Sequence, residues 1–292
     1  MNQLSRTTWK QVQSEHHRIV EPWIRPRLER RSHHLKHPVD DFLFEYYPIS
    51  PARIRTWHPG IGNSLEATIE DQDDFPQASY VFDGETIAIN QMWLEEQSER
   101  FAKILELLKA TQQRPSRTGC FGLHEWAMVV GDDTVRHADW KLRLTDEEIR
   151  ATIDAVGLRC THFDAFRFFT DEARPHNPLQ LTRSDQMSFE QPGCLHANMD
   201  LHKYASAIAP IIGSEIARDS FALAREIRTV DMQVAPYELS ALGITPIPVE
   251  TAEGRLEFAS RQQQFTLRAN ELRERLIAAL EPVLKGNSHT NQ

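Results

Sequence analysis

Residues 192–205 read PGCLHANMDLHKYA, and this stretch predicts a helix from Leu195 onward. His196 and Asp200 are four residues apart, so a helix places both side chains on one face, with Lys203 close by. A histidine and a carboxylate at this spacing can share a metal ion or act as an acid–base pair. Gly193 and the small residues after it leave room for a ligand. The alternative is a structural histidine and an exposed carboxylate beside Lys203.

Helical patterns continue on both sides of this stretch. Thr145 opens TDEEIRATIDAVG, which has acidic residues in its first turn and a glycine just past its end. Two prolines, Pro22 and Pro26, should split the helical region of residues 8–35 into two pieces. Further helices are expected over residues 37–47, 94–111, 195–209, 214–228 and 256–284. Short strands are expected near residues 79–89, 127–130 and 158–169.

The fold class expected from these patterns is mainly α, that is, an α+β chain with a few short strands and a His/Asp-rich central site. A chain of 292 residues is long enough to bury a full core. We expect a single compact helical domain over residues 1–285. Its expected parts are a basic N-terminal helical stretch (1–60), a catalytic core (about 119–205) and C-terminal helices (214–284), followed by a disordered tail (286–292).

The charge of the chain argues against a general nucleic-acid-wrapping surface, because the formal net charge is -9. Residues 1–60 are the exception: ten Lys and Arg against six Asp and Glu give +4, so the remainder carries -13. A basic stretch on an acidic body could meet a phosphate-bearing ligand. The alternative, a solvated helix with mixed charges, predicts that neutralising Arg25, Arg27, Arg30 and Arg31 leaves substrate binding nearly unchanged.

Two further features bear on the cellular setting. The chain has no run of about 18 apolar residues, and its N-terminus, MNQLSRTTWK, lacks the apolar core of a secretion signal. We therefore expect a cytoplasmic protein without membrane contact. Three cysteines, Cys120, Cys160 and Cys194, form an odd set with no CxxC pair. This pattern predicts reduced thiols instead of a disulfide framework or a thiolate zinc site.

A second chemical signal is RCTHFDAFRFFTD, residues 159–171. His162 and Asp164 are ionisable groups among phenylalanines, and burial there would raise the pKa of the carboxyl towards the range used in catalysis. We therefore expect Asp164→Asn to abolish turnover while leaving the fold intact. The alternative is a buried histidine bonded to a carbonyl group and an Asp164–Arg167 pair, in which case the same change should mainly destabilise the protein.

A third signal is GLHEWAMVV, residues 122–130, where His124 and Glu125 precede Trp126 and an apolar run. Charge beside such a run is costly unless it is paired or used. Adjacent residues point in different directions, so at most one of the two faces a site, and Glu125 is the candidate. A surface turn is the competing interpretation.

A fourth signal is WHPGIG, residues 57–62. It resembles the Gly-apolar-Gly hairpin through which helix-hairpin-helix glycosylases hold a DNA phosphate on backbone N–H groups. In that superfamily the catalytic aspartate follows the hairpin by about two dozen residues or fewer, and Asp83 lies near that distance. The competing interpretation is a tight glycine turn.

Six stretches between His37 and Arg255 together resemble a family of bacterial proteins commonly labelled 3-methyladenine DNA glycosylase. They are HPVDDFLFEYY, WHPGIG, CFGLHEWAMVV, LRCTHFDAFRFF, EQPGCLHANMDLHKYA and PYELSALGITPIPVETAEGR. The resemblance implies a DNA-repair type of hydrolase that cleaves an N-glycosidic bond in a nucleobase-containing substrate, with DNA as one candidate and no required cofactor.

Under this interpretation the candidate residues take defined roles. Asp164 is the general base, Asp200 or Glu125 is the second carboxylate, and His162 and His196 orient groups or transfer protons. The candidates for substrate binding are Trp57, Trp126, Phe163, Arg167 and Lys203.

Two other classes of protein compete with a glycosylase. The first is a metal-dependent hydrolase or oxygenase acting on a small molecule, in which His162, Asp164, His196 and Asp200 bind Fe, Mn or Zn. The second is a non-catalytic binding protein, in which these residues form a buried polar network. Both enzyme interpretations predict one site, in which His196 and Asp200 lie within reach of His162 or Asp164.

Overall fold

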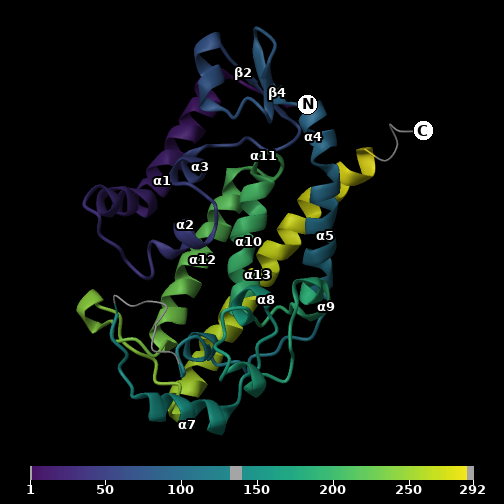
Figure 1. Cartoon of the computed structure of the whole chain (residues 1–292). Helices are drawn as coiled ribbons and strands as arrows, with labels where there is room; N and C mark the ends of the chain where they lie inside the picture. The colour runs from purple at the N-terminus through teal and green to yellow at the C-terminus, as the bar shows by residue number, and fades with distance from the viewer. Residues whose placement is uncertain (1, 132–139, 288–292) are drawn as a thin grey trace. The chain divides into compact units, whose positions relative to one another are not determined.

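The computed structural model describes residues 2–131 and 140–287 and confirms a mainly helical fold with one small mixed sheet (Figure 1). The described residues divide between two compact units, and each unit combines separate parts of the chain. The first unit draws on Met1–Leu108, Leu201–Ala222 and Leu272–Gln292, and the second on Lys109–Asp200 and Leu223–Glu271. A single domain over residues 1–285 stays a prediction.

The α-helices of the described residues are α1 (Arg6–Ser32), α2 (Phe42–Tyr46), α3 (Pro51–Arg55), α4 (Gln91–Glu96), α5 (Ser98–Gln112), α6 (His124–Ala127), α7 (Asp146–Val156), α8 (Phe163–Phe166), α9 (Gln186–Phe189), α10 (Leu195–Ala207), α11 (Ala209–Ile212), α12 (Ser214–Val234) and α13 (Ala252–Asn287). The 3-10 helices are η1 (Ile69–Asp74), η2 (Arg174–His176), η3 (Arg183–Asp185) and η4 (Ser240–Leu242). The strands are β1 (Asn2–Leu4), β2 (Asn63–Glu66), β3 (Tyr80–Phe82) and β4 (Thr86–Ile89).

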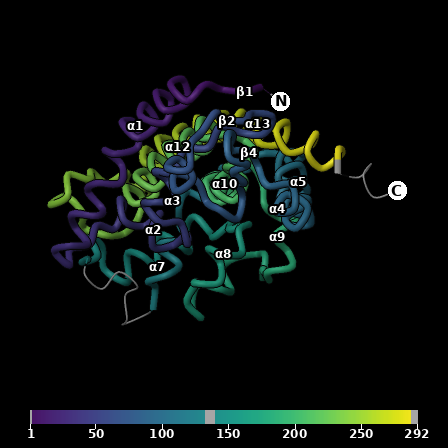
Figure 2. Tube along the Cα trace, turned by 90° about the horizontal axis from the view of Figure 1, so that it is seen from above, coloured from purple at the N-terminus to yellow at the C-terminus, as the bar shows by residue number. Residues whose placement is uncertain are grey.

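The sheet lies in the first unit and has the order β1-β2-β4-β3. Figure 2 labels three of its strands, β1, β2 and β4. β1 pairs in parallel with β2, whereas β2–β4 and β4–β3 are antiparallel. The β3–β4 hairpin confirms the strands expected at residues 79–89. Its buried face packs with Trp9, whose indole stacks on that of Trp57 at a centroid distance of 6.1 Å. Trp57 is thus part of a hydrophobic core.

Helix α1 corrects one expectation, because it runs unbroken through Pro22 and Pro26. A proline inside a helix removes one N–H donor and strains the carbonyl group four residues earlier. Pro22 is exposed, so a carbonyl group left without its helical partner there can bond to water. Buried residues elsewhere on the helix, including Val20 and Ile24, hold it against the rest of the first unit. Packing outweighs the local preference for a break.

The helix-hairpin-helix interpretation of WHPGIG is wrong. The segment does contain two glycines with positive φ, Gly60 (83°) and Gly62 (86°), but strand β2 follows it where the hairpin would need a second helix. Asp83 lies in the turn between β3 and β4, where its carboxylate accepts hydrogen bonds from the backbone N–H groups of Glu85 and Thr86. The tight glycine turn is therefore the correct interpretation.

Most of the expected helices are present, with shifted ends. The capping box at the start of α7 is confirmed: Thr145 accepts from the Glu148 N–H, Glu148 accepts from the Thr145 N–H, and Gly157 ends the helix with φ 78°. The expected helix over 94–111 is divided at Gln97 into α4 and α5, and the one over 37–47 is shortened to α2. Of the expected tail, Gly286 and Asn287 belong to α13, and residues 288–292 lie outside the described residues.

Two of the expected strands are absent from the described residues. Residues 127–130 follow the short helix α6 as turns, and residues 158–169 form an extended segment that leads into α8. Aromatic residues favour a strand, but a strand forms only where a partner strand can pair with it. In the described residues no strand pairs with either segment. Both regions instead carry side chains of the site described below.

Acidic partners offset part of the positive charge of the N-terminal stretch. Arg27 and Arg30 both form ion pairs with the buried Asp41, at 3.0 Å and 2.6 Å. This pairing corresponds to the mixed-charge interpretation of residues 1–60. In the part of the chain that the structure describes, no helix combines the length and apolar character needed to cross a membrane.

Candidate metal centre

Five separate parts of the second unit bring ionisable side chains into its interior. Helix α10 supplies His196 and Asp200, which confirms that these two residues belong to one helix. The residue before α8 is His162, and the residue after α9 is Glu190. The other side chains come from α6 and from the last turns of α12.

The first cluster consists of His162, Glu190 and Asp200, whose side chains are at most 2% exposed. His162 Nε2 lies 3.2 Å from Glu190 Oε1 and 3.6 Å from Asp200 Oδ2. Neither contact is aligned as a hydrogen bond, although both are short enough for strong electrostatic attraction. One potential ligand atom from each residue lies within 4.8 Å of the other two. Three ligand atoms this close together could hold a metal ion.

Electrostatics in the first cluster favour a positive charge between the carboxylates. Burial by itself lowers the pKa of His162, but the carboxylates of Glu190 and Asp200 outweigh it and raise the pKa to about 10. Gln186 Nε2 donates a hydrogen bond of 2.6 Å to Glu190 Oε1 and so fixes this carboxylate. A proton on His162, or a metal cation in its place, neutralises part of the negative charge.

The second cluster consists of His124, His196 and Asp231, all buried, again with ligand atoms within 4.8 Å of one another. His124 Nε2 lies 2.9 Å from Asp231 Oδ1, and the rings of His124 and His196 meet edge-to-face with centroids 4.4 Å apart. The other carboxylate oxygen of Asp231 accepts a 2.6 Å hydrogen bond from Arg228. Burial would raise the pKa of Asp231, but His124 and Arg228 hold it below its ordinary value.

The two clusters are neighbours. The rings of His162 and His196 stack with centroids 5.3 Å apart and an angle of 27° between their planes. Burial, together with the charges of His124 and His162, lowers the pKa of His196 well below its ordinary value, so its imidazole is neutral. Neutral imidazole is the form that binds metal ions.

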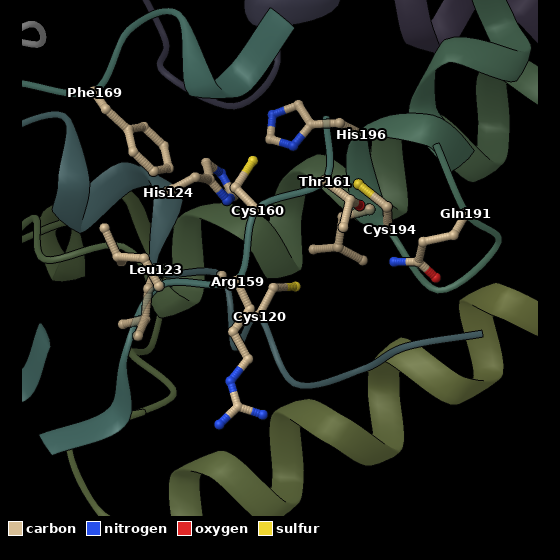
Figure 3. A pocket seen from close by; sticks show the side chains of 13 residues that line it. Cys120, Leu123, His124, Arg159, Cys160, Thr161, Phe169, Gln191, Cys194 and His196 are labelled. Atoms are coloured by element: carbon tan, nitrogen blue, oxygen red, sulfur yellow. The ribbon is translucent and has the colours of Figure 1, made fainter. Parts of the chain in front are cut away.

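All three cysteines line a small cavity together with His124 and His196 (Figure 3). Its volume is about 20 Å³, which admits about one water-sized group. No disulfide links the cysteines, as expected. Burial raises the pKa of Cys160 to about 12 and that of Cys194 well above its ordinary value, so both are protonated thiols with little nucleophilic character.

The structure confirms the expected proximity of His162 to Asp200 and His196, but it places Asp164 elsewhere. The Asp164 carboxylate is 15% exposed and lies 3.1 Å from Arg183 and 3.4 Å from Arg167. This is the arginine pairing weighed above as an alternative. Asp164 belongs to neither cluster.

The remaining candidates occupy different surroundings. Glu125 lies beside the second cluster and contacts it through Arg228, whose Nη1 donates to Glu125 Oε1 at 2.8 Å. Trp126 is fully buried and donates its indole N–H to the Val234 carbonyl group, so it is a core residue. Phe163 is half-buried under Arg183, and Lys203 lies over the Tyr204 ring in the first unit.

Sequence reasoning missed Glu190, Asp231 and Arg228. A signal for the last two was present in EIRTVDMQV, where Arg228 and Asp231 are three residues apart among apolar side chains and so share the buried face of a helix. Glu190 follows an exposed-type segment in SFEQPG, and only the tertiary fold brings it inside.

Comparisons with protein-family models, curated proteins and solved structures gave no match for this chain. The resemblance to the family labelled 3-methyladenine DNA glycosylase stays a prediction.

Proposed function

We propose that the protein is a metal-dependent enzyme that acts on a small molecule. His162, Glu190 and Asp200 hold one divalent ion, and the cluster of His124, His196 and Asp231 holds a second. One observation carries the proposal: two adjacent buried clusters each direct one ligand atom from three residues to a common point. Burying six ionisable groups is costly unless a cation or proton compensates the carboxylates.

The chemistry of the donors indicates which ions fit. Three imidazoles and three carboxylates suit Fe, Mn or Zn better than the soft metals that thiolates select. Two histidines with one carboxylate, the second cluster, form the ligand set of non-haem Fe(II) oxygenases. A bound ion would supply Lewis acidity or an activated water, so hydrolysis and oxygenation both fit. The protein itself contributes fixed ligands, since Arg228 orients Asp231 and Gln186 orients Glu190.

The N-glycosidic interpretation has less support from the site. Trp57 and Trp126, two of its proposed substrate-binding residues, are packed in hydrophobic cores. Its proposed general base, Asp164, is held by two arginines outside both clusters. The expected metal ligand set also needs correction, because Asp164 lies outside both clusters and His162, His196 and Asp200 are divided between them. We favour the metal interpretation because the remaining ligands lie close together without rearrangement.

Elemental analysis of the purified protein, before and after reconstitution with Fe(II), Mn(II) or Zn(II), tests the proposal. We expect two metal ions per chain in the wild type. His162→Ala should remove the ion of the first cluster, and His124→Ala that of the second. Asp164→Asn is the matched control and should retain both ions, because Asp164 is a nearby carboxylate that belongs to neither cluster.

Two results would contradict the proposal. One is a wild-type chain that takes up no metal at any tested concentration. The other is metal content that is unchanged in the His162→Ala and His124→Ala variants. Circular dichroism of each variant distinguishes loss of ligands from loss of fold.

A further inference from the structure

We propose that the substrate of this centre is an anion, and that its carboxylate or phosphate group binds to Arg117 and Arg159 in a cleft next to the metal clusters. The site of reaction rests on the metal centre proposed above, whereas the anion site rests on the cleft itself. The cleft lies entirely in the second unit and has a volume of about 700 Å³. That volume is within the usual range for small-molecule sites, about 300–1,000 Å³.

The charge of the cleft differs in sign from that of the whole chain. Three arginines line it, Arg114, Arg117 and Arg159, and none of its lining residues is acidic. The whole chain has a net charge of -9. A concave surface of one sign concentrates small ions of the opposite sign, so this cleft attracts anions.

The three arginines differ in what they contact. The guanidinium of Arg114 donates to the carbonyl groups of Glu190 and Met187, so it builds the wall of the cleft. Arg117 and Arg159 have exposed side chains that form no ion pair or hydrogen bond with another residue of the described segments. Their guanidinium groups are available for a carboxylate or phosphate, which arginine binds through paired N–H donors.

The wall that carries Arg117 is fixed to the chain that leads into α10. The buried amide of Gln191 accepts from the Arg117 N–H at 2.8 Å and donates to the Arg117 carbonyl group at 3.1 Å. The same amide oxygen accepts from the Gly193 N–H at 2.7 Å. This double contact holds the Arg117 backbone in one position. A ligand then loses less binding free energy to ordering this segment.

The cleft adjoins the cavity that reaches His124 and His196. Both are lined by Cys120, Arg159, Cys160, Thr161 and Gln191. Figure 3 shows Arg159 and Gln191 at the edge of the space into which the two histidine rings and the thiols point. Since the inner cavity admits only a water-sized group, the body of a substrate stays in the cleft and presents one small group inward.

The apolar part of the cleft suggests what the body of the substrate is. Pro178, Leu179 and Phe189 line it, so an organic anion with an aromatic or aliphatic body gains contacts that a bare inorganic ion lacks. Carboxylates and phosphate esters both carry anionic oxygens that accept the paired N–H groups of arginine. A matched pair of probes, one with each group, distinguishes a carboxylate substrate from a phosphate ester.

Isothermal titration calorimetry with phenylacetate, phenyl phosphate and the neutral phenylacetamide tests the inference on the metal-loaded protein. We expect the anions to bind, and the amide to bind at least tenfold more weakly. Preference for one anion identifies the substrate as a carboxylate or a phosphate ester. Arg117→Gln and Arg159→Gln should each weaken anion binding about tenfold, and the double variant should abolish it. Arg261→Gln, on the exposed side of α13 beside Glu257, is the control and should bind as the wild type does.

The metal content of every sample separates this inference from the proposed function. If all variants keep their metal and the double variant still binds the anions as the wild type does, the inference is wrong. Equal binding of the amide and the anions would also overturn it. A third outcome is that the wild type takes up no metal but binds the anions, and that the double variant does not bind them. In that case the anion site is supported and the metal-dependent function is wrong.

Discussion

At the scale of single residues, Arg228 has the largest predicted effect on stability. It is fully buried and holds two buried carboxylates, Glu125 at 2.8 Å and Asp231 at 2.6 Å. We expect Arg228→Met to lower the free energy of unfolding by about 3–5 kcal/mol, because both carboxylates then lose their buried guanidinium partner. Urea denaturation in the presence of a chelator measures the effect without a contribution from bound metal.

A surface arginine on a neighbouring helix serves as the control. Arg268 also contacts both oxygens of a carboxylate, that of Glu226, but the two side chains are 47% and 51% exposed. Arg268→Met should cost less than about 1 kcal/mol, since water screens an exposed pair. Equal losses of unfolding free energy in the two arginine variants would show that burial does not strengthen the contacts of Arg228 with its carboxylates.

Gly193 illustrates a second effect of a single residue. The sequence suggested that a small residue here leaves room for a ligand, but the backbone of Arg117 fills that room: a Cβ atom at Gly193 would lie 2.5 Å from the Arg117 carbonyl oxygen. We expect Gly193→Ala to destabilise the protein by roughly 1–3 kcal/mol, the usual cost of overpacking. Thermal melting measures it.

Gly119→Ala is the comparison for that substitution. It lies on the same cleft, where the added Cβ would meet only the flexible Arg159 side chain at 3.4 Å. This variant should melt close to the wild type. If both alanine variants melt at the same temperature, the close approach of the Arg117 backbone to Gly193 does not require a glycine there.

At the scale of elements, the start of α7 offers a test of capping. Thr145 accepts a hydrogen bond from the Glu148 N–H, and Thr145→Ala should cost about 1 kcal/mol. The same substitution at Thr229, which is exposed inside α12 and caps neither end, should be neutral or slightly stabilising because alanine is the better helix former. Chemical denaturation of both variants gives the sign of the change in unfolding free energy for each. A loss at Thr229 as large as at Thr145 would rule out a specific contribution from the cap.

Local sequence predicts elements of this kind well. Helix α7 has its cap, its acidic first turn and its terminal glycine within thirteen residues, so every signal is local. Helix α1 shows the limit: Pro22 and Pro26 are strong local signals for a break, yet burial of Trp9, Val20 and Ile24 keeps the helix continuous. The sequence holds no local record of that packing.

The site shows the same division between local and tertiary information. His196 and Asp200 were predictable as a pair because their spacing alone places them on one helical face. Asp231 was not, because it reaches its cluster from α12, and Glu190 was not, because nothing in its local sequence shows that the fold buries it. The aromatic neighbours of Asp164 indicated a buried catalytic carboxylate. In the structure this carboxylate instead accepts a hydrogen bond from Arg183, which is nineteen residues later in the chain.

At the scale of the molecule, buried histidines of the first unit predict how stability responds to acid. Burial lowers the pKa of His16 to about 4 and that of His58 to about 3, whereas both rise to about 6.5 in the unfolded chain. Below pH 6.5 the unfolded chain binds these protons and the folded chain does not. Stability should therefore be constant above pH 6.5 with respect to these groups and fall as the pH drops towards 4.

Urea midpoints between pH 7.5 and pH 4.5 measure this dependence. His16→Gln should make it shallower, because glutamine does not titrate but can still donate to the Ile54 carbonyl group, which His16 Nε2 contacts at 3.0 Å. An identical slope in the wild type and the variant would mean that His16 does not contribute.

The division of the chain between the two units also governs the order in which the protein can be assembled during synthesis. The first unit includes residues from Leu272 onward, and the second includes Leu223–Glu271, so both draw on helix α13. A ribosome releases the N-terminal residues first. Until α13 has left the exit tunnel, neither unit has all of its buried residues, among them Phe258 in the second and Leu276 in the first. The nascent chain therefore leaves apolar surface of both units uncovered until α13 emerges. A stop codon at Leu272 would remove the part of α13 that belongs to the first unit and leave the part that belongs to the second.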